Sequence, residues 1–293
     1  MIDKLEMFIA LARARHFGRA AEVCGVTQPS LSAAIKQLEE HMGVQLVFRG
    51  SRYQGLTPEG QRVLERAQGI VAEARALRDE MRSVKKGLAG NLRIGVIPTA
   101  LPVVAQLTTP FTQRHPAVSV TILSRTSAEI LDGIERLELE AGITYLDNEP
   151  LGRVLRQPLY VEFYRLVCAP GTQLAARAQV EWAELGGLPL CLLTGDMQNR
   201  RIINQHLAEA GVRAEPAVES NSTIALMAHV ATGHWVSILP KALADLFARS
   251  GAVKAVPIVA PEAEHLVGLI AAQRDPPTPL IVALMEEARR IAE

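Results

Sequence analysis

The sequence has little cysteine, few aromatic residues and no apolar run long enough to span a membrane. Its three cysteines, Cys24, Cys168 and Cys191, lie far apart and form no C-x-x-C pair, which argues against a disulfide framework and a thiolate metal site. Cys168 and Cys191 fall in apolar stretches, so we expect buried structural thiols rather than redox sensors. No run of about 18 apolar residues and no signal core is found. We therefore expect a soluble, cytoplasmic protein with no membrane contact.

Motifs of common catalytic and nucleotide-binding sites are also missing. The sequence has no G-x-S-x-G elbow, no Walker loop, no H-E-x-x-H and no G-x-G-x-x-G after a predicted strand. His229 and His234 are five residues apart across a predicted helix end, so they do not share a helix face. We predict no enzyme activity, no metal and no cofactor.

Length and charge indicate a chain of two or three parts. A chain of 293 residues with 48% hydrophobic residues can form full cores in each part. The net charge is zero, but residues 1–90 carry an excess of +4 and residues 91–293 an excess of −4. A mildly basic N-terminal part suits a polyanionic partner at that end only.

Residues 20–39 are typical of a helix-turn-helix. Ala20–Cys24 favours a short helix, Gly25 permits a tight turn, and Thr27 is a candidate N-cap for a second helix. Apolar residues recur on one face of that second helix: Leu31, Ala34, Ile35 and Leu38. Its other side carries short or polar residues: Gln28, Pro29, Ser30, Ser32, Ala33 and Lys36. A helix that docks in the major groove of DNA needs this division, although periodicity alone fits an ordinary helical hairpin equally well.

The next segments predict a wing and a long helix. Val44–Phe48 reads as a short strand and Arg49–Gly55 as a polar loop, from which Arg49 and Arg52 would reach phosphates or a minor groove. Thr57-Pro58-Glu59 then opens a helix whose apolar residues follow a heptad pattern: Val63, Ala67, Ile70, Ala74, Leu77, Met81, Val84 and Leu88. So narrow a seam needs one partner helix, so we predict a homodimer through residues 58–88.

From Asn91 the pattern changes to alternating strands and helices. Strands are predicted at 91–97, 118–123 and 141–145, with helices up to about 113 and over 127–140, which is the signature of a parallel sheet. A second lobe follows, with strands at 190–193, 217–219 and 236–239 and helices at 199–210 and 222–231. A return strand at 266–272 and a helix at 280–291 complete the first lobe.

Five ordered motifs in the N-terminal part resemble one known family. His16–Ala21, Thr27–Ser32, Ile35–Glu39, Gly43–Leu46 with Arg49, and Leu56–Gly60 are similar to the N-terminal domain of LysR-type transcriptional regulators. The departures are Ala33, where the family usually has Arg or a polar residue, and Val47, where it has Phe.

The resemblance implies an N-terminal, mainly α, winged helix-turn-helix over 1–57, a linker and dimerisation helix over 58–90, and an effector-binding domain over 91–293. That domain would be a two-lobed α/β fold like a periplasmic binding protein, with lobe I at about 91–161 and 267–293 and lobe II at about 162–266. Double-stranded DNA and a small-molecule effector are the implied partners, and a homotetramer the implied assembly. The implied DNA-binding residues are Gln28, Pro29, Ser30, Ser32, Lys36, Arg49 and Arg52.

Hydroxyl and amide residues recur at the strand ends of the predicted two-lobed domain. In open α/β sheets ligands bind beyond the carboxyl ends of the strands, where helix N-termini point. The candidate effector-binding residues are Thr99, Ala100, Ser127, Thr144, Thr194 and Asn199. Each alone fits a helix cap, but together, with no aromatic or cationic group, they favour a small anion such as sulfate, formate or a short carboxylate. This pattern is similar to LysR-type regulators of sulphur assimilation and cyanate use.

Two other functions remain possible on the same fold, a solute-binding transport protein and an enzyme. The winged helix-turn-helix and the missing signal core argue against the first, and the missing nucleophile, base or metal cluster argues against the second. The sequence leaves open the effector, the DNA target, activation or repression, and the roles of Thr144-Tyr145 and His234-Trp235.

Overall fold

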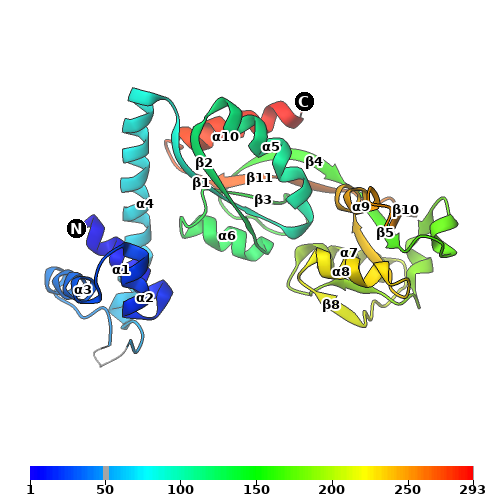
Figure 1. Cartoon of the computed structure of the whole chain (residues 1–293), viewed down its shortest axis with the longest axis horizontal. Coiled ribbons are helices and arrows are strands. Elements are labelled where there is room, and N and C mark those ends of the chain that lie inside the picture. The colour runs from blue at the N-terminus through cyan, green and yellow to red at the C-terminus, as the bar shows by residue number, and fades with distance from the viewer. Residues whose placement is uncertain (49–52, 293) are drawn as a thin grey trace. The chain divides into compact units, whose positions relative to one another are not determined.

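The computed structural model describes residues 1–48 and 53–292 (Figure 1). They form two compact units, Met1–Lys86 and Gly87–Glu293, each with its own core. In the described part of the chain, none of the helices combines the length and the apolar character needed to cross a membrane.

The first unit contains the predicted helix-turn-helix. Helices α1 (Ile2–Ala14), α2 (Phe17–Cys24) and α3 (Gln28–Met42) pack around a shared apolar core. Gly25 ends α2 with φ 65°, a conformation that glycine adopts without steric cost. The Thr27 hydroxyl caps α3 by accepting the N–H of Ser30. The predicted helix-turn-helix is therefore confirmed.

The strand predicted over Val44–Phe48 is reduced to an isolated bridge between Val47 and Leu56, with one backbone hydrogen bond on each side, from Phe48 N–H to Gly55 and from Thr57 N–H to Leu46. The reason is a competing acceptor. A carboxylate oxygen of Glu39 accepts the N–H groups of Leu46 (2.8 Å) and Val47 (3.2 Å), which diverts these donors from a sheet. Arg49 and Arg52 lie outside the described residues.

Helix α4 (Pro58–Lys86) carries the predicted heptad seam but uses its two halves differently. Of the seam residues, Ala67 is buried in the core of the first unit, but Ile70 is 50% exposed, and Val71, which is off the seam, is buried there instead. Farther along, Leu77 is 59% exposed and Met81 52% exposed. Leu88 lies beyond the helix end and packs on the core of the second unit.

The second unit begins with a five-stranded sheet in the order β2-β1-β3-β11-β4. Its strands are β1 (Ala89–Val96), β2 (Ala117–Ser124), β3 (Ala141–Tyr145), β4 (Val154–Glu162) and β11 (His265–Ala272). The first three are parallel, as predicted, whereas β11 runs antiparallel to β3 and β4. Its helices are η1 (Pro98–Ala100), α5 (Leu101–Arg114), α6 (Ser127–Glu135) and α10 (Pro279–Ala292).

A second lobe contains a four-stranded sheet, β6-β10-β5-β9, and a parallel pair, β7-β8. Its strands are β5 (Tyr164–Cys168), β6 (Val180–Glu181), β7 (Cys191–Leu193), β8 (Val218–Ser220), β9 (Ser237–Pro240) and β10 (Lys254–Val259). Its helices are η2 (Leu174–Ala176), η3 (Trp182–Leu185), α7 (Gln198–Glu209), α8 (Thr223–Ala231) and α9 (Lys241–Ala248). The chain crosses between the lobes after β4 and before β11, which confirms the two-lobed α/β fold.

Two features of this unit differ from the predictions. Strands β4, β5, β6 and β10 and helix α9 were not predicted, although their residues form part of the two lobes. The helix predicted over 127–140 is wrong beyond Glu135, where the chain turns through Leu137 at φ 58°. This turn brings the side chain of Leu139 against Gly95 and Gly133, and burying Leu139 outweighs continuing the helix.

Two glycines of α4 provide a matched test of the first unit. A Cβ at Gly60 would lie 2.0 Å from the carbonyl oxygen of Leu46, whereas a Cβ at Gly69 would meet nothing within 4 Å. Gly60→Ala should lower the free energy of unfolding of this unit by at least about 2 kcal/mol through backbone displacement. Gly69→Ala should raise it by about 0.5–1 kcal/mol through helix propensity. Equal effects of the two substitutions in urea unfolding monitored by circular dichroism would contradict this packing.

Candidate functional site

Three helices of the second unit begin around one cavity. They are α5, preceded by the turn η1, and α6 from the first lobe, and α7 from the second (Figure 1). The cavity contains about 210 Å³ of space not filled by atoms, part of it open to solvent. It is lined by Ile97, Pro98, Thr99, Ser127, Tyr145, Leu193, Met197, Gln198 and Asn199. Because this volume includes open solvent, the enclosed part of the cavity is small.

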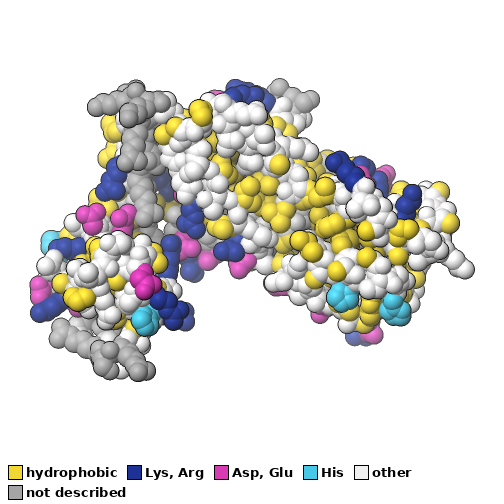
Figure 2. Space-filling model, in the orientation of Figure 1, with side chains coloured by type: hydrophobic (Ala, Val, Ile, Leu, Met, Phe, Trp, Pro, Cys, Tyr) yellow, Lys and Arg dark blue, Asp and Glu magenta, His cyan; other side chains and the backbone are white. Residues whose placement is uncertain are grey.

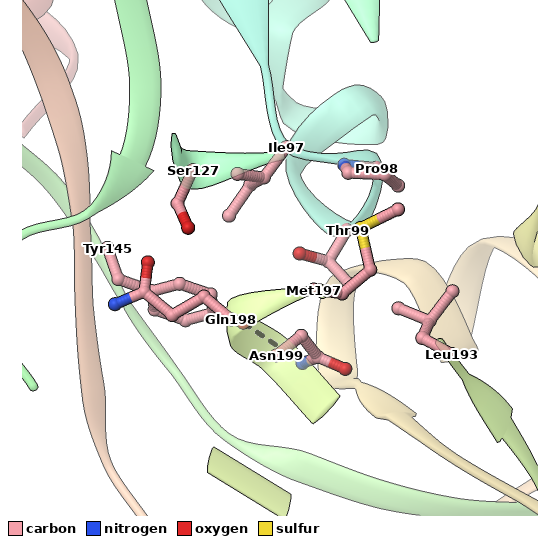
Figure 3. Close-up of a pocket in the computed structure, with 9 residues that line it drawn as sticks. All are labelled: Ile97, Pro98, Thr99, Ser127, Tyr145, Leu193, Met197, Gln198 and Asn199. Atoms are coloured by element: carbon pink, nitrogen blue, oxygen red, sulfur yellow. Dashed lines mark hydrogen bonds between the residues drawn. The ribbon is translucent and has the colours of Figure 1, made fainter. Parts of the chain in front are cut away.

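Four of the lining side chains carry a buried polar atom that has no hydrogen-bond partner. Within the described residues, Thr99 Oγ1, Ser127 Oγ, Gln198 Oε1 and Asn199 Oδ1 are buried and have no hydrogen-bond partner. In Figure 3 the hydroxyl groups of Thr99 and Ser127 point toward the same space. Buried polar groups are normally paired, and an unpaired one costs about 1–3 kcal/mol. The cavity is therefore built to be completed by a polar ligand or by water.

Backbone donors add to these side chains. The first N–H groups of a helix have no partner inside the helix and carry a partial positive charge. Helices α5, α6 and α7 begin near the cavity, although Pro102 has no N–H to offer in α5 and the Thr126 hydroxyl already accepts the N–H of Glu129 in α6. None of the nine lining residues is Lys or Arg, so the positive potential comes from backbone dipoles rather than from side-chain charge.

The structure brings together only some of the residues predicted for this site. Thr99, Ser127 and Asn199 line the cavity, but Ala100, Thr144 and Thr194 do not. Ala100 is part of the apolar core. The hydroxyls of Thr144 and Thr194 are buried and, among the described residues, unpaired. Thr144 misses the cavity because successive side chains of a strand point to opposite faces, and its neighbour Tyr145 takes the cavity side.

The expectation that no aromatic group lies at this site is wrong, because Tyr145 is fully buried and lines the cavity. Gln198, which directly precedes the candidate Asn199, also lines it, as does Met197, which the sequence did not indicate. Strand alternation indicates that only one of Thr144 and Tyr145 faces the cavity, but not which of the two. The position of Met197 follows from the loop between β7 and α7, for which the sequence carries no comparable signal.

Tyr145 connects the cavity to a buried carboxyl group. The amide Nδ2 of Asn199 donates to the Tyr145 hydroxyl at 3.0 Å, and this hydroxyl donates to an oxygen of Glu162 in a short hydrogen bond. Tyr160 and Tyr164 also donate to Glu162, at 3.4 Å and 3.5 Å. Burial raises the pKa of Glu162 to about 8, against the lowering effect of the three tyrosine hydroxyls. Glu162 is therefore mostly neutral at pH 7.

The same region holds a histidine pair where the chain crosses between lobes. The Nε2 atoms of His206, on α7, and His265, at the start of β11, are 3.0 Å apart. Asp147, just after β3, lies 3.4 Å from His265 Nδ1 and accepts the N–H of Leu266 at 3.0 Å. Burial lowers the pKa of His206, with a contribution from His265. Among the described residues no group of three or more metal-ligating side chains could hold a metal ion.

Cys168 and Cys191 are fully buried, as the sequence predicted, whereas Cys24 is partly exposed. No cysteine is among the cavity-lining residues. Burial raises the pKa of the Cys168 and Cys24 thiols and brings the pKa of Cys191 to about 11. A thiol reacts with oxidants as the thiolate, so the raised pKa values lower the thiolate fraction of all three cysteines near pH 7.

Helix α3 of the first unit exposes the predicted DNA-contact face. Leu31, Ile35 and Leu38 are buried. Gln28, Pro29, Ser30, Ser32 and Lys36 are all exposed. Figure 2 shows Lys and Arg side chains over the visible face of this unit, with acidic side chains among them. The surface is only mildly basic, in agreement with the small charge excess of the sequence.

Comparisons with known proteins cover nearly the whole chain. The family model "Bacterial regulatory helix-turn-helix protein, lysR family" matches residues 2–61, and the model "LysR substrate binding domain" matches residues 85–293. A "Probable hydrogen peroxide-inducible genes activator" of Mycobacterium avium is 30% identical over 92% of this chain and 87% of its own length. The "DNA-binding transcriptional dual regulator OxyR" of Escherichia coli is 28% identical over 92% of this chain and 88% of its own.

Solved structures show the same two-unit architecture. A full-length OxyR variant from Pseudomonas aeruginosa superimposes with a TM-score of 0.75 and 28% identity, covering 99% of this chain and 94% of its own. Full-length CbnR in complex with its target DNA gives a TM-score of 0.73 at 22% identity, with both chains fully covered.

Proposed function

Because the chain belongs to the LysR family of bacterial transcriptional regulators, we propose that it contacts DNA bases through α3 and responds to a small anion in the cavity of its second unit. Regulation of transcription by DNA binding follows from the family itself. The observation that supports the effector proposal is the gathering of unpaired, buried hydroxyl and amide groups at three helix N-termini. The solute-binding and enzyme alternatives are not favoured by a chain in which both units match regulator models. Its place of action is then the cytoplasm, where the DNA lies.

Base contacts are assigned to the exposed face of α3. Gln28 stands at the first position of the helix and is exposed, with an amide that can pair bidentately with adenine. Ser30 and Ser32 offer short hydroxyls, and Pro29 adds a low-profile apolar contact. Lys36 pairs only loosely with Glu40, at 3.8 Å between Nζ and Oε1, so its ammonium group can turn to DNA. Arg49 and Arg52 remain predicted phosphate contacts.

Two glutamines on α3 provide a matched test of this face. The DNA site is first selected with the unaltered protein from a random pool of duplexes. Gln28→Ala should weaken binding to that site by about 1–3 kcal/mol and binding to random DNA much less. Gln37 is also exposed but lies on the opposite side of the helix from Gln28. Gln37→Ala should therefore change neither the affinity for the selected site nor that for random DNA. An unchanged ratio of specific to random affinity for Gln28→Ala in fluorescence anisotropy titrations would disprove the base contact.

Dimerisation is assigned to the exposed part of the α4 seam. Leu77 and Met81 leave more than half of their side-chain surface in water in the single chain. They lie four residues apart on one helix face, which is the spacing of a two-helix contact. A second α4 helix would bury both. Two such dimers would then form the homotetramer that the family resemblance implies.

The dimer proposal is tested with substitutions at the seam. Leu77→Asp combined with Met81→Asp should halve the particle mass measured by sedimentation velocity, because buried unpaired carboxylates oppose the contact. Arg78→Asp, an exposed neighbour off the seam, introduces the same charge and should leave the mass unchanged. An unaltered mass for the double variant would place the dimer contact elsewhere.

The effector assignment rests on the chemistry of the cavity. Hydroxyl groups and helix N-termini bind anions without a cationic side chain, which favours a small, compact anion over a large acid. Neutral Glu162 behind Tyr145 removes the charge that would otherwise repel an anion. A peroxide response, as the names of the relatives state, is not carried over to this chain. Its cysteines are buried or have raised pKa values, and none of the three lines the cavity.

A panel of ligands separates a small anion from other effectors. Sulfate, formate and acetate are compared with benzoate by thermal shift, and a ligand at about 100 times its Kd should stabilise the protein by about 2.7 kcal/mol. Thr99→Val and Ser127→Ala should abolish the shift of the bound small anion. Thr108→Val is the control, since the Thr108 hydroxyl binds the carbonyl of Val104 within α5 rather than the cavity. The assignment would be overturned if only benzoate shifted the melting temperature, or if neither cavity variant changed the shift caused by a small anion.

A further inference from the structure

Glu162 is a buried carboxyl group that the effector chemistry alone does not require. It is 2% exposed and ends β4, at the first crossing between the lobes. In the described part of the chain, no Lys or Arg forms an ion pair with it, and its hydrogen bonds come from Tyr145, Tyr160 and Tyr164. A buried carboxylate without a cation is costly. Its connection to the cavity through Tyr145 suggests a use for it.

Hydrogen bonds link Asn199, Tyr145 and Glu162, and the ionisation state of Glu162 determines which group donates in each of them. With Glu162 ionised, the carboxylate only accepts, so the Tyr145 hydroxyl must donate to it. The hydroxyl oxygen then accepts from Asn199 Nδ2, at 3.0 Å, and Asn199 Oδ1 is the amide atom left over. That oxygen is buried, has no partner among the described residues, and belongs to a cavity-lining side chain. An ionised Glu162 therefore leaves an unpaired hydrogen-bond acceptor on a side chain that lines the cavity.

Protonation of Glu162 permits the opposite direction. The O–H of protonated Glu162 donates to the Tyr145 oxygen. The Tyr145 hydroxyl then donates to Asn199 Oδ1, after the amide group of Asn199 has flipped so that its oxygen and nitrogen exchange places. The N–H₂ group of Asn199 is then the atom left over, and it offers a donor. The two orientations of an amide differ little in shape, so hydrogen-bond partners alone select between them.

We propose that Glu162 determines the hydrogen-bond polarity of the effector cavity through Tyr145 and Asn199, so that anion binding is coupled to the uptake of one proton by Glu162. This inference rests on the proposed function, because it requires an anion in the cavity. The proton comes from solvent and resides on the carboxyl group, and no other bond changes.

The groups that face Glu162 define the pH range of a test. Besides the three tyrosines, Asp147 lies close enough to raise its pKa, and the histidine pair His206 and His265 packs on the rings of Tyr164 and Tyr145. Burial raises the pKa values of all three tyrosines, so they stay neutral. The pKa of His206 is lowered from 6.5, so above about pH 7 its charge no longer changes. With the pKa of Glu162 at about 8, the informative range is about pH 7 to 9.5.

The test measures the Kd of acetate and sulfate by isothermal titration calorimetry over this range, in which both probes remain fully ionised. For the unaltered protein, Kd should be level below about pH 8 and rise about tenfold per pH unit above it. Titrations in two buffers of different ionisation enthalpy at about pH 9 should show uptake of one proton. Glu162→Gln, which keeps the shape and hydrogen-bonding capacity of a neutral side chain, should give a Kd independent of pH.

Two tyrosine variants separate the hydrogen-bond chain from simple charge repulsion. Tyr145→Phe removes the link but leaves Glu162, so the pH dependence of Kd should disappear. Tyr160→Phe removes a different hydrogen bond to the same carboxyl group, outside the cavity-lining set, and should keep the pH dependence. If Tyr145→Phe retains the full slope, the charge of Glu162 acts directly and the proposed chain is wrong.

Thermal melts without ligand check the state of Glu162 independently. Between about pH 4.5 and 8 the folded chain holds a proton that the unfolded chain has released, so Glu162 lowers stability progressively as pH rises through this window. The difference in melting temperature between Glu162→Gln and the unaltered protein should therefore increase as pH rises through this window. Above the window it should stay constant. If no anion of the panel binds, the proposed function fails and this inference fails with it. If an anion binds with a Kd independent of pH in the unaltered protein, only the inference is wrong.

Discussion

Buried hydrogen-bonding groups need partners, and the cavity of the second unit depends on this constraint. Thr99, Ser127, Gln198 and Asn199 come from two lobes, and each has a buried polar atom that no described residue satisfies. A ligand that binds all of them contacts both lobes at once. Its free energy of binding therefore favours the arrangement in which the lobes lie together around it, which is how a small molecule can change the shape of a two-lobed domain.

The crossings between the lobes lie beside this cavity rather than far from it. Glu162 ends β4, Tyr164 opens β5, and His265 opens β11, so the hydrogen bonds of Glu162 and the histidine pair join the segments that a lobe movement would bend. Tyr145 belongs to both sets, since it lines the cavity and donates to Glu162. Changes at the cavity and at the crossings are thus connected by one side chain.

Much of the fold could be predicted from the sequence because the signals are local. The N-cap at Thr27, the turn at Gly25 and the period of the apolar residues predict the helix-turn-helix, and alternating strands and helices predict the two α/β lobes. Local signals failed where a distant contact decided the structure. Glu39 takes the backbone donors of Leu46 and Val47, and Leu139 ends α6 early by packing on Gly95 and Gly133.

For the site, the sequence by itself determined which segments end in hydroxyl and amide residues near helix starts, because caps and strand ends have local signatures. It therefore indicated Thr99, Ser127 and Asn199 correctly as cavity residues. Only the tertiary structure decided that Tyr145 rather than Thr144 faces the cavity, that Thr194 does not, and that Glu162 lies behind Tyr145. Which face of a strand meets a ligand, and which residues 17 positions apart share a hydrogen bond, depend on how sheets and lobes pack, and no local pattern encodes that packing.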